Sequence, residues 1–240
     1  MTTLVKIIVT TILAALLVSC NFDINFGVKG NGNVTTTNRE IHGDFNAIEV
    51  SRGLDVYLTQ GESSTVKVQA DENLQDIIRT EIENGVLIIY AEDNISSAAS
   101  KKVMVNFKTI ERISTSSGSD LISTNLITAE TLKIETSSGS DVELDVDVKN
   151  LICESSSGSD IKLSGTTNTF RAEASSGSDI KAAKLKAVKT RAEANSGADI
   201  TVNTSEELTA YANSGGDIKY YGNPDKVEKN DGPSGSVRKY

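Results

Sequence analysis

The stretch "SSSGSDIKL", Ser155 to Leu163, indicates a repeat architecture, because its core returns along the chain at a nearly constant interval. Copies of Ser-Ser-Gly-Ser-Asp stand at 116–120, 137–141, 156–160 and 175–179, with altered copies "NSGAD" at 195–199 and "NSGGD" at 213–217. The motif glycines follow one another at steps of 21, 19, 19, 20 and 18 residues. A period near twenty residues is typical of a repeat architecture, in which each repeat is one structural unit.

The residues around the motif alternate in character. The positions three and five before each glycine, and three and five after it, are small or apolar, while the positions between them are polar. Residues two apart on a strand share one face. Each repeat is therefore predicted to be a strand, a tight corner and a second strand. The glycine supplies a corner conformation that a side chain resists, and the serines and aspartate supply hydrogen bonds to it.

Such a unit cannot bury its apolar face alone, but it can when it stacks on copies of itself. The fold class predicted is all-β, a parallel β-solenoid with coils of about twenty residues and neighbouring strands about 4.8 Å apart. The alternative is a chain of antiparallel hairpins that turn at the same motif. Columns of like residues in step along the chain favour the stacked coils.

The rest of the chain gives the domain boundaries. Residues 34–222 are predicted to form a single solenoid domain, with 34–109 as a divergent part of alternating strands and 110–222 as the regular repeats. One short helix is expected near 72–80, because Leu74, Ile77 and Ile78 would share a face. This helix and the tail at 223–240 are the expected caps.

The N-terminus predicts export and anchoring. Residues 1–19 combine Lys6 with an apolar run that is too short to span a membrane, as in a signal peptide. The run ends in "LVSC", which resembles a bacterial lipoprotein box with Cys20 as the lipidated residue. Residues 20–33 would then be a tether. An ordinary secretory signal with a chance cysteine is the alternative. The predicted location is the cell envelope, lipid-anchored to the outer membrane, on either its periplasmic or its surface side.

Composition excludes several function classes. The net charge of −9 argues against nucleic acid as a partner, because phosphates would repel the protein. Cys153 is the one cysteine left beside a lipidated Cys20, so no internal disulfide is expected. Its column is otherwise filled by isoleucine and alanine, which indicates a small core residue. The single histidine, His42, lies outside the repeats, and nothing near it marks a catalytic base.

The motif aspartates form the candidate site. Stacking would place them in one row, and two charges 4.8 Å apart repel by about 0.9 kcal/mol in a water-like dielectric, or about 4–5 kcal/mol over the five adjacent pairs. The members of this candidate cation or ligand row are Asp120, Asp141, Asp160, Asp179, Asp199 and Asp217.

Three arrangements could offset this repulsion. The carboxylates could accept hydrogen bonds from corner N–H groups and serine hydroxyls. The lysines two residues further on, Lys162, Lys181 and Lys219, could neutralise them. Cations could also lie between coils, since "SGSDIKL" resembles the calcium repeat of bacterial β-rolls. The motif comes once per coil and lacks the second glycine, so few oxygens are available for calcium, and no cofactor is expected.

The order of segments resembles one family. "DFNAIEVSRGLDVYLTQ" followed by repeated "SSGSD" and closed by "YYGNP" is similar to the head GIN domain family of auto-transporter adhesins over about residues 34–238. The resemblance implies a Gram-negative envelope location and a β-helical body, and it brings no catalytic or ligand residues. "SRGLD" at 51–55 looks like an early copy of the repeat.

The sequence thus predicts a non-enzymatic, lipid-anchored envelope protein that displays a polar, Ser- and Asp-rich surface for adhesion or binding. The partners expected are the membrane, through the anchor, and a glycan or another envelope protein. Two alternatives stay open. A carbohydrate-active enzyme on a β-helix would need carboxylates that converge in a groove with aromatic walls. A periplasmic structural lipoprotein would have no external ligand.

Overall fold

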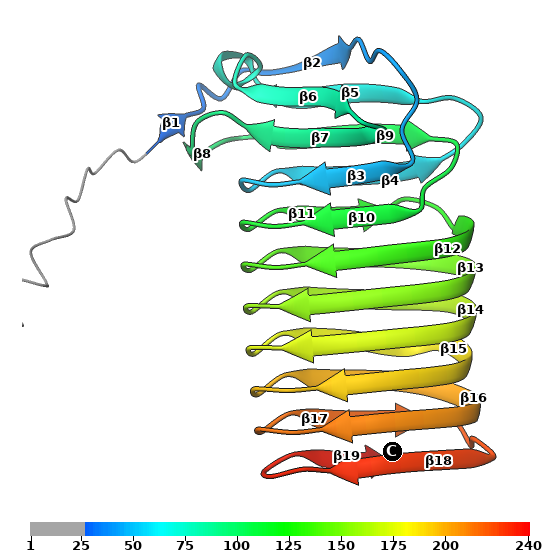
Figure 1. The fold of residues 1–240 in the computed structure, drawn as a ribbon. Coiled ribbons are helices and arrows are strands. Elements are labelled where there is room, and N and C mark those ends of the chain that lie inside the picture. The colour runs from blue at the N-terminus through cyan, green and yellow to red at the C-terminus, as the bar shows by residue number, and fades with distance from the viewer. Residues whose placement is uncertain (1–26) are drawn as a thin grey trace, which may run out of the picture.

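Stacked coils make up almost the whole of the computed structural model, which describes residues 27–240 (Figure 1). The predicted signal peptide, Cys20 and the first part of the tether lie outside the described residues. The strands of the N-terminal part are β1 (Val28–Lys29), β2 (Val34–Arg39), β3 (Ala47–Val50), β4 (Asp55–Gln60), β5 (Thr65–Asp71), β6 (Ile78–Glu83), β7 (Val86–Ala91), β8 (Ile95–Ser97) and β9 (Lys101–Phe107). The strands that follow are β10 (Arg112–Thr115), β11 (Asp120–Ser123), β12 (Ile127–Thr136), β13 (Asp141–Ser156), β14 (Asp160–Ser175), β15 (Asp179–Ala194), β16 (Asp199–Ala212), β17 (Asp217–Tyr221), β18 (Lys226–Asp231) and β19 (Ser236–Lys239).

From β10 onward the strands pair only in parallel, each with its counterpart in the neighbouring coil. Equivalent residues stand opposite one another, as Ile161 does to Ile180. The predicted β-solenoid is confirmed, with about seven turns of about 19 residues. The antiparallel hairpin alternative is wrong for these repeats.

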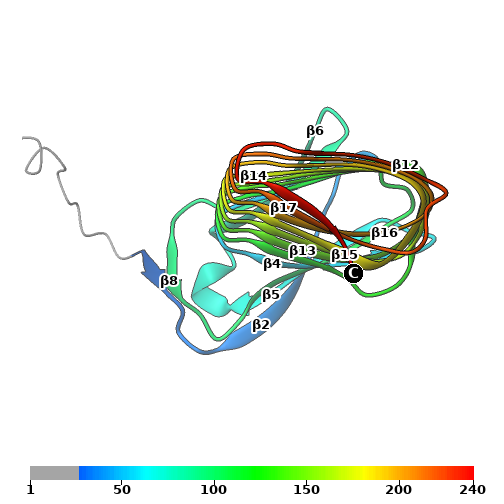
Figure 2. The same ribbon diagram turned by 90° about the horizontal axis from the view of Figure 1, so that it is seen from below.

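The coil has one tight edge and one rounded edge (Figure 2). The repeat motifs form the tight edge, whereas the long strands β13 to β16 continue around the rounded edge without a break. Strand β14 must bend to follow this edge. Gly165 has φ 109°, and a Cβ there would lie 1.9 Å from the Val146 carbonyl oxygen. This glycine therefore allows two coils to approach closely where the strand curves.

Each regular corner is a turn with two left-handed residues. In the corner of residues 156–159, Ser157 has φ 57° and Gly158 has φ 69°. Positive φ at both central residues defines the type I′ turn, which favours glycine. The space outside Gly158 is open, so its φ and not crowding requires glycine. The corners also continue the ladder between coils, since the Gly158 N–H donates to the Ser176 carbonyl at 3.2 Å.

The N-terminal part does not follow chain order. β3 and β4 form a coil that lies beside β10 and β11, but their other neighbours are β7 and β9. β5 pairs antiparallel with both β9 and β2, and β6 pairs antiparallel with β7. The chain therefore runs away from the first coil, forms an antiparallel block at the end of the column, and returns past that coil to start the regular repeats (Figure 1).

The prediction of a short helix near 72–80 is wrong. A single 3₁₀ turn covers Glu72–Leu74, and Ile78 already begins β6. Asn84 and Gly85 both have positive φ, 51° and 78°. This type I′ turn joins β6 to β7 as a hairpin, and the β-branched residues before it suit a strand better than a helix. Tertiary pairing thus overrides the helical spacing.

The last coil continues the stack to the end of the chain. β18 pairs with β16, and β19 pairs with β17, both in parallel. Ser234 in the corner between them has φ 58°, as the corner serines of earlier coils have.

The core changes along the column. Large side chains fill the N-terminal part, where Leu58, Leu87 and Phe107 are completely buried. Alanines occupy inward positions beside the tight edge in the later coils, as Ala192 and Ala210 do. The coils narrow at this edge, so small residues are required where opposite walls meet.

Candidate functional site

The motif aspartates form a row along the tight edge. Strand register places Asp120, Asp141 and Asp160 opposite one another in successive coils, and the row continues through Asp179, Asp199 and Asp217. Asp55 extends it by one coil toward the N-terminal part, because Asp55 stands opposite Asp120. "SRGLD" is therefore a true early copy of the corner, with Arg52 and Gly53 both left-handed.

The row lies on the outer surface. Asp120, Asp141 and Asp199 are exposed, and the other three are half-buried. The pKa of the Asp120 carboxyl is raised, first by its partial loss of hydration against the protein surface and then by its neighbours Asp141 and Asp55. Like charges in adjacent coils are therefore felt at this end of the row.

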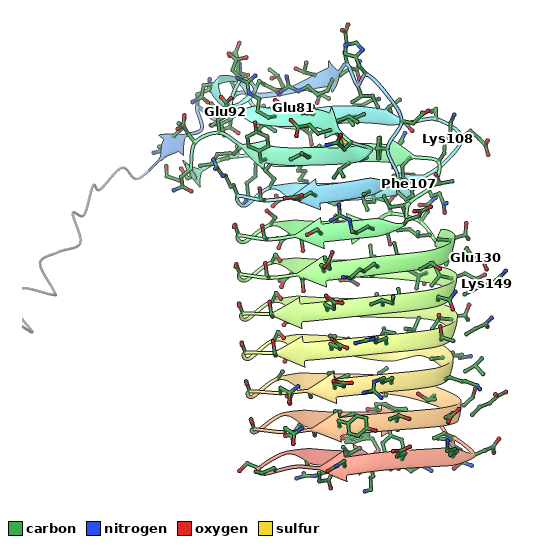
Figure 3. All side chains as sticks on the ribbon, in the orientation of Figure 1. Glu81, Glu92, Phe107, Lys108, Glu130 and Lys149 are labelled. Atoms are coloured by element: carbon green, nitrogen blue, oxygen red, sulfur yellow. The ribbon has the colours of Figure 1, made fainter. Side chains whose placement is uncertain are left out.

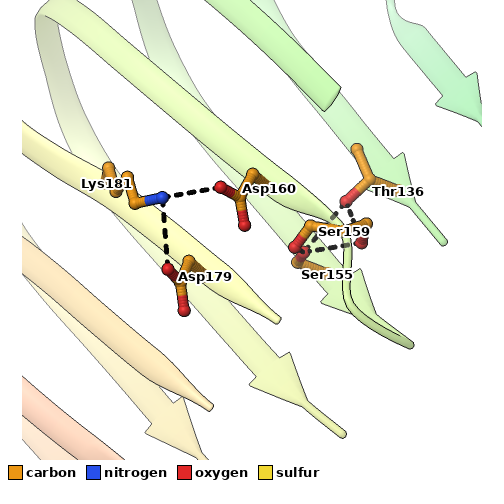
Figure 4. A network of polar contacts seen from close by, with 6 residues as sticks. All are labelled: Thr136, Ser155, Ser159, Asp160, Asp179 and Lys181. Carbon is orange, nitrogen blue, oxygen red and sulfur yellow. Dashed lines mark hydrogen bonds and ion pairs between the residues drawn. The ribbon is translucent and has the colours of Figure 1, made fainter. Parts of the chain in front are cut away.

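One lysine neutralises part of the row. The Lys181 Nζ lies 2.6 Å from an Asp160 carboxylate oxygen and 3.1 Å from an Asp179 oxygen, so it bridges two coils (Figure 4). This contact raises the pKa of Lys181. Lys162, which was expected to do the same, pairs instead with Glu143 at 2.8 Å. Lys101 lies 3.5 Å from Asp55 at the start of the row.

The hydrogen bonds within the corner of residues 156–159 come from the buried serine, whereas in the last coils the Asp217 carboxylate accepts a hydrogen bond from the Ser236 hydroxyl. Ser159 is completely buried, and its hydroxyl donates to the Ser156 carbonyl at 2.8 Å and accepts from the Ser156 N–H at 3.2 Å. The same hydroxyl lies 2.9 Å from those of Thr136 and Ser155 (Figure 4). Where Ala198 replaces this serine, its N–H donates directly to the Asn195 carbonyl. The serine network thus stabilises the corner and leaves the carboxylates facing outward.

A second row lies on the other side of the corner, in a shallow groove of about 630 Å³. Four glutamates of successive coils line it: Glu135, Glu154, Glu173 and Glu193. Sequence reasoning placed this column on the outer face but did not recognise the groove. Its depth depends on how the long neighbouring side chains fold over the sheet, and the alternation of residues does not show this.

Ion pairs hold this glutamate row. Lys133 contacts Glu135 at 2.8 Å and Glu154 at 3.2 Å, and both contacts raise the pKa of Lys133. Arg171 and Arg191 pair with the other two glutamates. None of the residues that line the groove is aromatic. The groove therefore lacks the aromatic walls that a carbohydrate-active site would need, and its carboxylates are engaged with cations.

The remaining candidate residues carry no site. Cys153 is fully buried, and burial raises the pKa of its thiol, which makes it a core residue. His42 is exposed beyond the first coil. Within residues 27–240, no group of three or more His, Cys, Asp or Glu side chains is arranged to hold a metal ion.

In the described part of the chain, no helix has the length and apolar character needed to cross a bilayer.

Stacked parallel coils with uncovered polar faces make this a β-solenoid protein. The sequence matches the family described as "Putative auto-transporter adhesin, head GIN domain" over residues 44–224. The chain belongs to the head GIN domain family. The resemblance stated from the repeats is thereby confirmed for the family, whereas the lipoprotein form stays a prediction. The family description names adhesion and no catalytic activity.

Several solved structures share the fold. A "putative adhesin" from Bacteroides fragilis is 21% identical, with a TM-score of 0.83 over 89% of this chain and 100% of that one. A "putative lipid binding protein" from Parabacteroides distasonis is 23% identical, with a TM-score of 0.71 over 89% and 99% of the two chains. A "putative adhesin" from Parabacteroides merdae is 21% identical, with a TM-score of 0.70 over 89% and 98%. No curated protein sequence matches the chain.

Proposed function

We propose that this chain is a non-enzymatic, lipid-anchored binding protein of the cell envelope, and that its solenoid is a rigid surface for adhesion. The observation that supports this best is the pair of uncovered polar rows beside the tight edge. The aspartate row and the glutamate row repeat one side chain per coil, at the spacing of the strands. A surface of this kind can contact a repeating polymer at several points at once, and several weak contacts together give strong retention.

The rounded edge supports the same function. Side chains project outward from it along the whole column, and Figure 3 labels two of them, Glu130 and Lys149. These two pair across neighbouring coils at 2.7 Å, and both are well exposed. Exposed pairs of this kind contribute little to stability. They leave a charged, hydrated surface that suits a partner recognised by polar contacts.

Adhesion can be tested with the purified protein on beads. We expect beads that carry the protein to be retained on immobilised polysaccharides or on isolated envelope material above a serum albumin control. Vesicles of neutral and anionic phospholipid belong in the same panel, because one protein of the same fold is described as lipid binding. If beads are retained on none of these surfaces, a structural role without an external ligand replaces adhesion.

The anchor needs its own test, because Cys20 lies outside the described residues. We expect the wild-type chain to incorporate labelled palmitate and to fractionate with membranes. Cys20→Ala should abolish both. Cys153→Ala is the matched control, since this thiol is buried in the core and should not affect either result. An unlabelled wild-type chain in the soluble fraction would contradict the lipid anchor and leave the adhesive surface untouched.

A further inference from the structure

A hollow of about 430 Å³ lies on the outer face of β4, β5 and β9, in the N-terminal part and next to the first member of the aspartate row, Asp55. We propose that this hollow binds an acidic sugar residue, such as a uronic acid, of a polysaccharide ligand. The proposal rests on the adhesive function and names the ligand class for one site. The volume falls within the range of small-molecule sites, about 300–1,000 Å³.

Strand register brings the lining side chains together. Tyr57 of β4 stands opposite Met104 of β9, and Met104 stands opposite Lys67 of β5. Lys102 lies two residues before Met104 on β9, so it points to the same outer face. Its ammonium group lies 5.5 Å from the centre of the Tyr57 ring. An aromatic ring, a thioether and two ammonium groups therefore line one hollow.

The charge of this hollow is opposite to that of the protein. Neither Asp nor Glu lines it, although the chain as a whole carries a net charge of −9. Within the described part of the chain, no carboxylate pairs with Lys67 or with Lys102. Asp55 is the register neighbour of Lys102, but its carboxylate contacts Lys101 instead. Two ammonium groups without a carboxylate partner, in a hollow that neither Asp nor Glu lines, favour an anionic ligand.

The other lining groups indicate a sugar. Thr59, Thr65 and Asn106 present hydroxyl and amide groups around the hollow, and these can exchange hydrogen bonds with sugar hydroxyls. Thr59 is held by a 2.6 Å hydrogen bond to Thr124, so this side of the rim is ordered. Tyr57 and Met104 offer an apolar surface to the C–H face of a pyranose ring, and the carboxylate of a uronic acid would meet Lys67 and Lys102.

The test uses two tetrasaccharides that differ in charge. Hyaluronan tetrasaccharide, which alternates glucuronate with N-acetylglucosamine, is titrated into the full chain by calorimetry. The neutral N-acetylglucosamine tetramer is titrated in parallel. We expect hyaluronan to bind at least tenfold more tightly than the neutral tetramer at low salt. We expect the difference to shrink in 0.5 M NaCl, because salt screens the ammonium groups.

Variants locate the site. Lys67→Met and Lys102→Met keep the length of the side chain and remove its charge, and together they should weaken hyaluronan binding at least tenfold. Lys219→Met is the matched control, since Lys219 is an exposed strand lysine in a distant coil. All three variants should keep the melting temperature of the wild type.

The outcomes separate the site from the function. Failure of hyaluronan to bind, equal binding of the neutral tetramer, or an equal loss in Lys219→Met would overturn the site. The site would also be overturned if beads carrying the wild type and beads carrying the Lys67→Met, Lys102→Met double variant were retained equally on acidic polysaccharide. Adhesion itself would stand in that case. Preferred binding to phosphatidylglycerol vesicles would replace the sugar by an anionic lipid and contradict the proposal.

Discussion

The N-terminal part and the regular coils form one column by different means. From β10 onward each coil repeats the last one, in parallel and in register, with small residues at the tight edge. Before β10 the chain mixes parallel and antiparallel pairs, and large side chains fill its core. The difference shows that repetition is sufficient to bury the apolar faces inside a stack, where every coil has two like neighbours. At the end of the stack it is not sufficient, because one neighbour is missing.

The two ends also manage their edges differently. At the N-terminal end, the antiparallel block of β2, β5 and β6 covers the coil formed by β7 and β9. At the C-terminal end, β18 leaves all six residues exposed and reads "KVEKND", so charges alternate along its edge. Charged residues on an edge strand discourage pairing with another chain. One end is thus covered by structure and the other is protected by charge.

The largest expected effect comes from emptying the N-terminal core. Phe107→Ala should lower the free energy of unfolding by about 3–5 kcal/mol, because it removes a completely buried aromatic side chain and leaves a cavity. Urea denaturation would measure this, with Phe107→Leu as a milder control. A loss below about 1 kcal/mol would mean that the antiparallel block can collapse around the cavity.

Enlarging a side chain in the regular coils should come next. Ala192→Leu puts extra volume where Ala172 and Ala210 stack on either side, and overpacking costs about 1–3 kcal/mol. Urea denaturation of the same series is the measurement. Both variants would then be destabilised, but for opposite reasons: the N-terminal core by the loss of side-chain volume and the regular coils by its addition. A neutral result would show that the tight edge has spare space.

Asp71 gives a pH dependence to the N-terminal part. Its carboxylate accepts N–H bonds from Gly32 at 2.8 Å and from Ala99 and Ser100 at 3.0 Å, and these bonds lower its pKa. A lowered pKa in the folded state means that the stabilisation is present above the unfolded value, near 3.9, and is lost as the pH falls through the folded value.

Asp71→Asn should therefore lower the melting temperature at pH 7, because the new amide turns a donor toward N–H groups that need an acceptor. The deficit should shrink as the pH falls below about 4, where the unfolded chain takes up the proton, and should vanish once the pH has passed the lowered pKa of the folded carboxyl. Thermal unfolding at pH 7 and pH 3 would measure both. An equal deficit at the two pH values would show that shape, and not charge, makes Asp71 important.

The corner serine should have a moderate effect. Ser159→Ala removes a buried hydroxyl that bonds Ser156 and two neighbouring side chains, and it should cost about 1 kcal/mol in urea denaturation. The reverse change, Ala198→Ser, should be neutral or stabilising, because the four preceding corners hold a serine in this place: Ser119, Ser140, Ser159 and Ser178. A destabilised Ala198→Ser protein would mean that the fifth corner has its own packing.

The smallest expected effect is of opposite sign. Asp120→Asn should raise stability at pH 7 by roughly 0.2–1 kcal/mol, because it removes a charge that faces Asp55 and Asp141 and is screened by solvent. The raised pKa of Asp120 means that its cost appears as the pH rises through that value. The gain measured by thermal unfolding should vanish at pH 3 and fall in high salt. A loss of stability would show that attractive contacts of the Asp120 carboxylate outweigh its repulsion by Asp55 and Asp141.

Much of the fold could be predicted because the repeats are local. The glycines at steps near nineteen and the alternation around Ile161 or Ile180 suffice to place a corner, an inner face and an outer face. The aspartate row followed from the same register. Which lysines would pair with the aspartates could not be predicted, because Lys162 and Lys181 occupy equivalent positions but form ion pairs with different partners.

The N-terminal part could be predicted only as separate strands. Ile78 had the spacing of a helix, and only its pairing with β7 decided for a strand. Nothing in the order of β3 to β9 shows that β7 and β9 lie between the first coil and the antiparallel block. The hollow at Tyr57, Lys67 and Lys102 depends on that order, so sequence reasoning missed it.

Local sequence is sufficient to specify the coil: its length, its corners with residues of positive φ, and which side chains face inward or outward. Each of these follows from backbone geometry over a few residues and from burial that alternates with period two. The tertiary structure alone decided how the column ends, which charges meet, and where strands far apart in sequence form a hollow. Those outcomes depend on strand pairing between distant segments. The pairing that forms is the one that buries most of the apolar sheet faces.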